Sequence, residues 1–223
     1  MQIRRPPAGR PWRYLLSGAP CDADALGVRE RGGVRSSTRA KRIVTSLLSR
    51  TVVTVVRTRF QICLSGELPP AGCVLVSHHD SYWDGVVAAA LDPRVVPITS
   101  SRWRSIPALG SFLDAYGVLW TDAETISHAM ALVGRGDACW LAPHAFDRGR
   151  GHTPAHLGAA RICTGAGVPL VPLVLSGLSD LTRGRGPRSA AEVSIGLPVW
   201  PKDGEEPAEF SARAESALPG AAY

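Results

Sequence analysis

The sequence is short of several residue types and patterns, and each shortage narrows what the chain can be. Only 6% of its 223 residues are aromatic, and lysine occurs only at Lys41 and Lys202. No window holds the roughly 18 uncharged apolar residues that a membrane-spanning helix needs, so we expect no such helix. The early apolar stretch YLLSGA is shorter than the roughly 7–15 residues of a signal-peptide core. The length suits one globular domain, or one domain with an appendage.

The sequence also lacks any C-x-x-C pair, the pattern that zinc ribbons and thioredoxin-like redox sites use. Its cysteines form an odd set, and three of them lie in apolar runs. They are Cys21, Cys63, Cys73, Cys139 and Cys163. We therefore expect reduced thiols in a cytoplasmic protein, with neither disulfides nor a metal site.

Positive charge is concentrated at one end of the chain. Residues 1–60 carry a local balance of +10 and residues 61–223 a balance of −4, which sum to the net charge of +6. A basic front is typical of contact with anionic lipid or nucleic acid, and equally of a solvated tail. No nucleic-acid-binding motif is present, so nucleic acid is not an expected partner.

The chain divides into two expected parts. Residues 1–37 show no periodic apolar pattern, which predicts an irregular basic segment. From residue 38 apolar residues recur at helical spacing, and this predicts a basic amphipathic helix at the start of a domain over residues 38–223. Its β-branched residues would also allow a strand from Val52. The helix would lie peripherally on the inner face of the cell membrane, or pack on the domain with its arginines in water.

Short apolar segments then alternate with helical patterns. Strands are expected at 59–65, 73–77, 95–100, 117–121, 138–143, 168–177 and 191–200, and helices at 84–91, 105–115, 123–133, 153–164 and 205–218. Thr153 and Pro154 would be the N-cap and first residue of the helix over 153–164. This alternation predicts an α/β layered domain with a mostly parallel central sheet flanked by helices.

The segment VLVSHHDSYWDG, residues 74–85, contains the candidate catalytic residues. A buried strand leads to His78 and His79, and Asp84 follows as a helix begins. Ligands of such sheets bind beyond the carboxyl ends of the strands. A neutral imidazole can take a proton from a hydroxyl or amine when a carboxylate fixes its tautomer. On one helix the two side chains would lie about 140° apart, so we expect His79 in the loop and Asp84 on the first helical turn.

Other interpretations of these residues are weaker. The histidines could simply cap the helix. A zinc site lacks H-E-x-x-H, and a serine hydrolase lacks G-x-S-x-G. The segment is also similar to the HHxxxDG motif of peptide-synthetase condensation domains, but here four residues separate His79 from Asp84.

VSHHDSYWD resembles the first motif, NHxSxxD or H-x4-D, of the glycerolipid acyltransferase superfamily, which includes lysophosphatidate acyltransferases. His79, Ser81 and Asp84 take the motif positions, and His78 replaces the usual Asn. Later landmarks follow in the family's order: WRSIPALGSF, then GVLWTDAE at G-x-x-F-I-x-R, LAPHAFDRG at FPEGTRS, and HLGAARICTGAGVPLVPLVL. The similarity spans about residues 59–177.

The resemblance implies an enzyme similar to 1-acylglycerol-3-phosphate O-acyltransferase, which serves phospholipid or specialised metabolite biosynthesis. His79 would act as general base on an acceptor that attacks the thioester of acyl-CoA or of an acyl carrier protein, and Asp84 would orient His79. Neither a metal nor another cofactor is implied. The alternative is a non-catalytic relative that binds membranes or lipids.

Several positions depart from the family's motifs. The second-motif Arg, which is thought to hold the acceptor phosphate, falls on Ala123 beside Asp122, and His144 replaces the third-motif Glu. Arg148 is a candidate to restore positive charge. A phosphate dianion favours cations and N–H donors. The acceptor is therefore expected to be either a lysophospholipid-type lipid or a neutral or amine metabolite.

Five further residues are predicted to bind substrate: Ser81, Trp83, Trp120, His144 and Arg148. The two tryptophans could line an acyl or acceptor pocket, although core positions are favoured. His144 would either contact substrate or fill the space left by the family's Glu.

Overall fold

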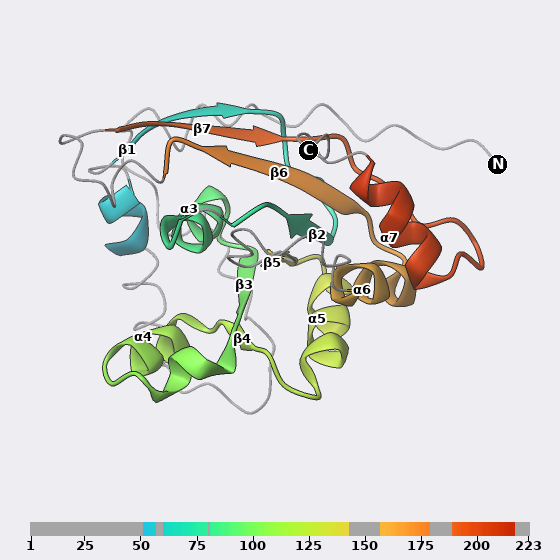
Figure 1. The fold of residues 1–223 in the computed structure, drawn as a ribbon, viewed down its shortest axis with the longest axis horizontal. Helices are drawn as coiled ribbons and strands as arrows, with labels where there is room; N and C mark the ends of the chain where they lie inside the picture. Colours follow the sequence, from blue (N-terminus) through green and yellow to red (C-terminus); the bar gives the residue numbers. More distant parts are fainter. Residues whose placement is uncertain (1–50, 57–59, 80, 143–156, 179–188, 217–223) are drawn as a thin grey trace, which may run out of the picture. The chain divides into compact units, whose positions relative to one another are not determined.

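The computed structural model describes residues 51–56, 60–79, 81–142, 157–178 and 189–216 (Figure 1). The predicted boundary between residues 37 and 38 lies outside these ranges, as does most of the predicted amphipathic helix. Residues 51–56 are helical, so the alternative of a strand starting at Val52 is wrong. Val52 and Val56 are both buried, as the helical spacing of the apolar residues requires.

Within the described residues, seven strands form one sheet in the order β1-β7-β6-β2-β5-β3-β4. In Figure 1, β1, β7 and β6 lie together at one end of this order and β3 and β4 at the other. The strands are β1 (Phe60–Ser65), β2 (Cys73–Val76), β3 (Val95–Thr99), β4 (Leu119–Trp120), β5 (Ala138–Leu141), β6 (Leu170–Ser176) and β7 (Ser189–Ile195). All neighbouring pairs are parallel except β6 and β7. The predicted mostly parallel sheet is confirmed.

Helices connect the strands, as the alternating pattern predicts. They are α3 (Trp83–Leu91), the 3-10 helix η1 (Ser101–Ser105), α4 (Leu109–Tyr116), α5 (Thr125–Val133), α6 (Gly158–Ala166) and α7 (Pro207–Glu215). Because β2, β3, β4, β5 and β6 run in one direction, their carboxyl ends lie along the same edge of the sheet.

Alternating side chains of the central strands enter two different cores. In β2, Cys73 and Leu75 pack with residues of α3, whereas Val74 and Val76 pack with residues of α5 and α6. In β5, Trp140 lies on the α3 face and Cys139 on the other. Successive strand residues point to opposite faces, so a strand covered on both sides must be apolar throughout. This explains why CVLV reads as an unbroken apolar run.

Two predicted helices differ from those observed. The expected helix over 105–115 is observed as α4, which begins only at Leu109, because Pro107 and Ala108, whose φ of 62° is not helical, precede it. The described part of the expected 153–164 helix is α6, which begins at Gly158 with Leu157 as its N-cap, and the predicted cap residues Thr153 and Pro154 lie outside the described residues.

The described cysteines are free thiols. Burial raises the pKa of Cys73 to about 12 and also raises the pKa values of Cys139 and Cys163. These three thiols therefore stay protonated at neutral pH and are poor nucleophiles. Cys63 is exposed, and Cys21 lies outside the described residues.

The described ranges contain neither a membrane-spanning helix nor a cluster of metal-binding side chains. None of the helices there is both long enough and apolar enough to cross a bilayer. Nor does that part of the chain bring together three or more His, Cys, Asp or Glu side chains that could hold a metal ion.

Candidate active site

The loop between β2 and α3 lies at the edge of the sheet where the five parallel strands end. β2 stops at Val76, and Ser77, His78 and His79 follow directly. The same edge receives Leu178, just after β6, whose carbonyl accepts a hydrogen bond of 3.2 Å from the Ser81 hydroxyl. The loop is therefore tied to a strand end that lies 97 residues further along the chain.

His79 and Asp84 are joined as the sequence predicts. Nδ1 of His79 lies 2.9 Å from Oδ2 of Asp84, with His79 in the loop and Asp84 in the first turn of α3. The His79 side chain is 16% exposed and the Asp84 side chain only 2%. A buried carboxylate needs hydrogen-bond donors to offset its lost hydration, and the His79 ring supplies one of them.

Ser81 supplies the second donor and also organises the start of α3. Its backbone N–H donates to Oδ2 of Asp84 at 3.0 Å, and its hydroxyl oxygen accepts the N–H of Trp83 at 3.2 Å. This reciprocal pattern resembles a capping box, with Asp84 in the position usually held by Glu or Gln, but the N-cap of α3 is Tyr82 and the Ser81 hydroxyl accepts from Trp83 instead of from Asp84. Ser81 is 2% exposed. These contacts favour a role in positioning Asp84 over the predicted contact with substrate.

Trp140, at the end of β5, borders the pair and is absent from the sequence prediction. It is 5% exposed, and its ring meets the His79 ring edge-on with centroids 5.8 Å apart. Its indole N–H donates to Oγ of Ser77 at 3.0 Å. A Cβ added at Gly85 would lie 3.0 Å from Cζ3 of Trp140, so the indole packs against the first turn of α3. The glycine of the WDG sequence was the available signal for this close approach.

The other predicted substrate-binding residues are placed less centrally or lie outside the described ranges. Trp83 is half-buried against the core on the α3 side. Trp120 is also half-buried, and its indole N–H donates to Asp114 at 2.7 Å. Substrate contact by these tryptophans stays a prediction. His144 and Arg148 lie outside the described residues, so the structure does not place them beside His79.

The corner between β4 and α5 carries a negative charge where the family's motif has an arginine. Oδ1 of Asp122 accepts hydrogen bonds from the Thr125 hydroxyl and the Glu124 N–H, both at 2.9 Å. These bonds, led by that of Thr125, lower the pKa of Asp122. Asp122 therefore stays ionised at neutral pH, and its neighbour Ala123 contributes no positive charge.

Comparisons with known proteins agree with this arrangement. The protein-family model described as Acyltransferase matches residues 61–176, which is more than half of the chain. The chain belongs to this acyltransferase family. The match confirms the resemblance to glycerolipid acyltransferases, and its range covers the loop that holds His79 and Asp84.

The fold of this acyltransferase is also similar to a solved structure. That structure is the crystal structure of the 1-acyl-sn-glycerophosphate (LPA) acyltransferase PlsC from Thermotoga maritima. The TM-score is 0.62 at 17% sequence identity, and the alignment covers 84% of this chain and 82% of that one. No curated protein sequence matches this chain. The likeness to PlsC confirms the predicted fold class.

Proposed function

We propose that this acyltransferase moves an acyl group from a thioester, either acyl-CoA or an acyl carrier protein, to a hydroxyl or amine acceptor, with His79 as general base. The observation that carries the proposal is the 2.9 Å contact between Nδ1 of His79 and Oδ2 of Asp84. An ionised carboxylate only accepts hydrogen bonds, so this contact favours the tautomer that carries its proton on Nδ1. Nε2, on the other side of the ring, is then the basic nitrogen.

Transfer would proceed through one tetrahedral intermediate. Nε2 of His79 takes the acceptor's proton as the acceptor oxygen or nitrogen attacks the thioester carbonyl carbon. The intermediate then collapses, the carbon–sulfur bond breaks, and the imidazolium returns the proton to the leaving thiolate. Asp84 stabilises the imidazolium, while the positive N-terminal end of α3, which begins beside this loop, favours the developing oxyanion.

We further propose that the acceptor is not held through a phosphate monoester at the β4–α5 corner. The ionised carboxylate of Asp122 would repel a phosphate dianion there, and Ala123 offers no cation to offset it. A lysophospholipid without a terminal phosphate, or a neutral or amine metabolite, meets no such repulsion. This leaves the two acceptor classes expected from the sequence and disfavours lysophosphatidate itself.

The test is acyl transfer by the purified full chain. Acyl-CoA and acyl carrier protein donors of several chain lengths are offered with lysophosphatidate, lysophosphatidylcholine, simple alcohols and amines, and the acylated product is measured by mass spectrometry. Detection of the product rather than of released thiol avoids reaction of the reagent with the exposed Cys63. We expect acceptor-dependent product, with lysophosphatidate as a poor acceptor.

Two results would contradict the proposal in different ways. Strict preference for lysophosphatidate would refute the acceptor assignment but leave the transfer mechanism intact. Absence of product with every donor and acceptor, combined with tight binding to lipid vesicles, would identify a non-catalytic lipid-binding relative.

A further inference from the structure

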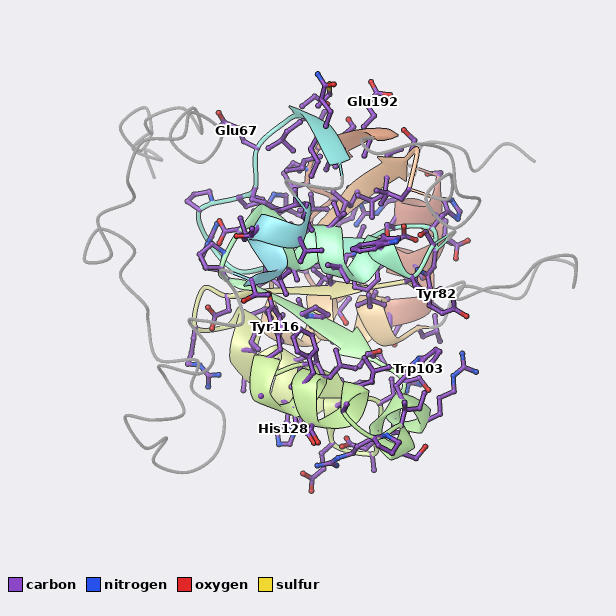
Figure 2. The ribbon with its side chains drawn as sticks, turned by 90° about the vertical axis from the view of Figure 1, so that its left-hand side faces the viewer. Glu67, Tyr82, Trp103, Tyr116, His128 and Glu192 are labelled. Atoms are coloured by element: carbon purple, nitrogen blue, oxygen red, sulfur yellow. The ribbon has the colours of Figure 1, made fainter. Side chains whose placement is uncertain are left out.

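Exposed apolar side chains, the half-buried Trp103 and an arginine gather beside the candidate active site. Tyr82 is 64% exposed, and its ring meets the ring of Trp103 edge-on with centroids 5.9 Å apart. Figure 2 shows both residues on the same side of the ribbon. Ile106 and Leu109 are 40% and 37% exposed, and the guanidinium of Arg102 lies 5.3 Å from the Trp103 ring centroid. We call these five residues the aromatic–arginine patch.

The patch lies at the same edge of the sheet as His79. Tyr82 stands between His79 and Asp84 in the loop after β2, and η1, which carries Trp103, follows the carboxyl end of the parallel strand β3. The ring contact between Tyr82 and Trp103 therefore joins the candidate catalytic loop to η1. A surface bound by the patch would lie next to the loop that carries His79 and Asp84.

The backbone under the patch is fixed rather than loose. The N–H of Ile106 donates to the Trp103 carbonyl at 3.2 Å, and the N–H of Gly110 donates to the Ile106 carbonyl at 2.9 Å. A Cβ added at Gly110 would lie 2.3 Å from the Arg104 carbonyl oxygen, so α4 packs directly on the backbone of η1. Ala108, between the two helices, has a φ of 62°, which residues other than glycine rarely adopt. Such strain persists where surrounding contacts enforce it, and it is concentrated at binding sites.

We propose that the aromatic–arginine patch docks on a lipid surface. Trp and Tyr rings favour the boundary between lipid headgroups and acyl chains, because one part of each ring is apolar and another is polar. Ile106 and Leu109 would enter the apolar layer, while Arg102 would reach the lipid phosphates above it. In the described ranges, Arg102 takes part in no ion pair, so its charge is not already balanced by a carboxylate.

An acidic protein partner fits the patch less well. Arg104, the other arginine of η1, already pairs with Asp114 at 3.6 Å. The ionised Asp122 adds negative charge near the end of the neighbouring strand β4. The positive charge at this edge is therefore largely offset, and the exposed apolar side chains are its main distinguishing feature. This composition favours an apolar layer beneath phosphates over the acidic surface of a carrier protein.

The test is co-sedimentation of the full chain with vesicles, without substrate. One set contains phosphatidylcholine alone, and the other also contains phosphatidylglycerol. Trp103→Ala removes one aromatic ring from the lipid contact, and this variant should therefore bind both sets of vesicles roughly tenfold more weakly. Loss of one charge near the surface should weaken binding of Arg102→Ala to vesicles with phosphatidylglycerol by roughly fivefold, and much less to phosphatidylcholine alone, whose headgroups carry no net charge.

Matched controls come from the opposite edge of the sheet. Trp200 is 53% exposed and adjoins Val199, which pairs with Leu170 at the amino end of β6. Arg135 is exposed and precedes the amino end of β5. Trp200→Ala and Arg135→Ala should bind both kinds of vesicle as the unchanged protein does. Every variant keeps the same basic residues 1–60, so any contribution of that segment cancels in the comparison.

Three results would overturn the proposal, provided that circular dichroism shows each variant to be folded. One is negligible binding of the unchanged protein to both vesicle sets at low salt. Another is an equal loss of binding in Trp103→Ala and Trp200→Ala. The third is unchanged vesicle binding by Trp103→Ala together with lost capture by an immobilised acyl carrier protein, which would identify a protein-docking surface. No substrate is present, so these results are independent of whether the proposed acyl transfer takes place.

Discussion

Oδ2 of Asp84 accepts two hydrogen bonds at once, from Nδ1 of His79 at 2.9 Å and from the Ser81 N–H at 3.0 Å. The His79 ring is thus held by a carboxylate that is itself fixed to the first turn of α3. Because Asp84 belongs to the first turn of α3, the orientation of the His79 ring depends on the stability of that turn. Substitutions that disturb the helix start should therefore affect both folding and turnover.

Ser81→Ala should lower both stability and activity. The substitution removes the hydroxyl that accepts from the Trp83 N–H and donates to the Leu178 carbonyl. Loss of such a cap typically costs about 1 kcal/mol. Chemical denaturation should detect this loss, and kcat should fall because the loop that positions His79 and Asp84 is no longer tied to Leu178. Ser111→Ala, on an exposed turn of α4, should change stability by less than about 0.5 kcal/mol. Equal effects of the two substitutions would contradict the role assigned to Ser81.

Gly85→Ala should displace Trp140 and with it the His79 ring. The added methyl would lie 3.0 Å from a buried indole that is hydrogen-bonded to Ser77 and has little room to move. We expect a loss of about 1–3 kcal/mol from overpacking, roughly tenfold lower kcat/KM, and a changed pH profile. At Gly158, where nothing lies within 4 Å of an added Cβ, the same substitution should be neutral or stabilising. If Gly85→Ala leaves both stability and kcat/KM unchanged, Trp140 does not constrain the His79 ring.

Ala108→Gly should stabilise the protein by about 0.5–1 kcal/mol, because glycine adopts the observed φ of 62° without strain. The comparison is Ala131→Gly at an exposed position within α5, which should destabilise by about 1 kcal/mol. Thermal unfolding separates the two, since one midpoint should rise and the other fall. A fall in both would mean that Ala108 is not strained.

The contribution of the Glu205–Arg213 pair to stability should be lost in acid. Hydrogen bonds from Arg213 lower the pKa of Glu205 from 4.5 to about 2, and the two side chains approach within 2.6 Å. A carboxyl whose folded pKa is lowered stabilises the fold above its unfolded pKa, and less as the pH falls towards the folded pKa. The stability difference between the unchanged protein and Glu205→Gln should therefore be constant at neutral pH and shrink below about pH 4.5. A difference that grows on acidification would be inconsistent with this pair.

The sequence predicts those features that depend on local patterns. Unbroken apolar runs mark the strands buried on both faces, and the H-x4-D spacing anticipates that His79 in a loop meets Asp84 on a helix. Both signals are short-range, because a strand end and a helix start fix the backbone between them. The late start of α4 at Leu109, instead of the predicted start at residue 105, also has a local cause in Pro107, which apolar spacing alone does not take into account.

Features that depend on distant contacts could not be predicted in the same way. Trp140 donates to Ser77, 63 residues earlier, only because β2 and β5 pair with Leu75 opposite Trp140. Nothing in the sequence around Ser77 or Trp140 indicates this strand register. The antiparallel pairing of β6 with β7 likewise depends on contacts between separate strands, such as Leu173 opposite Ile195.

The most direct test of the account compares acceptor-dependent acyl transfer by His79→Ala and His78→Ala, the two adjacent histidines of one loop. Loss of the general base should lower the turnover of His79→Ala by roughly 10²–10⁴-fold, and His78→Ala should be much milder. Asp84→Asn should lose about as much as His79→Ala, and the double variant little more, because residues acting as one unit are not additive. An inactive His78→Ala beside an active His79→Ala, both folded by circular dichroism, would contradict the assignment of His79 as the base.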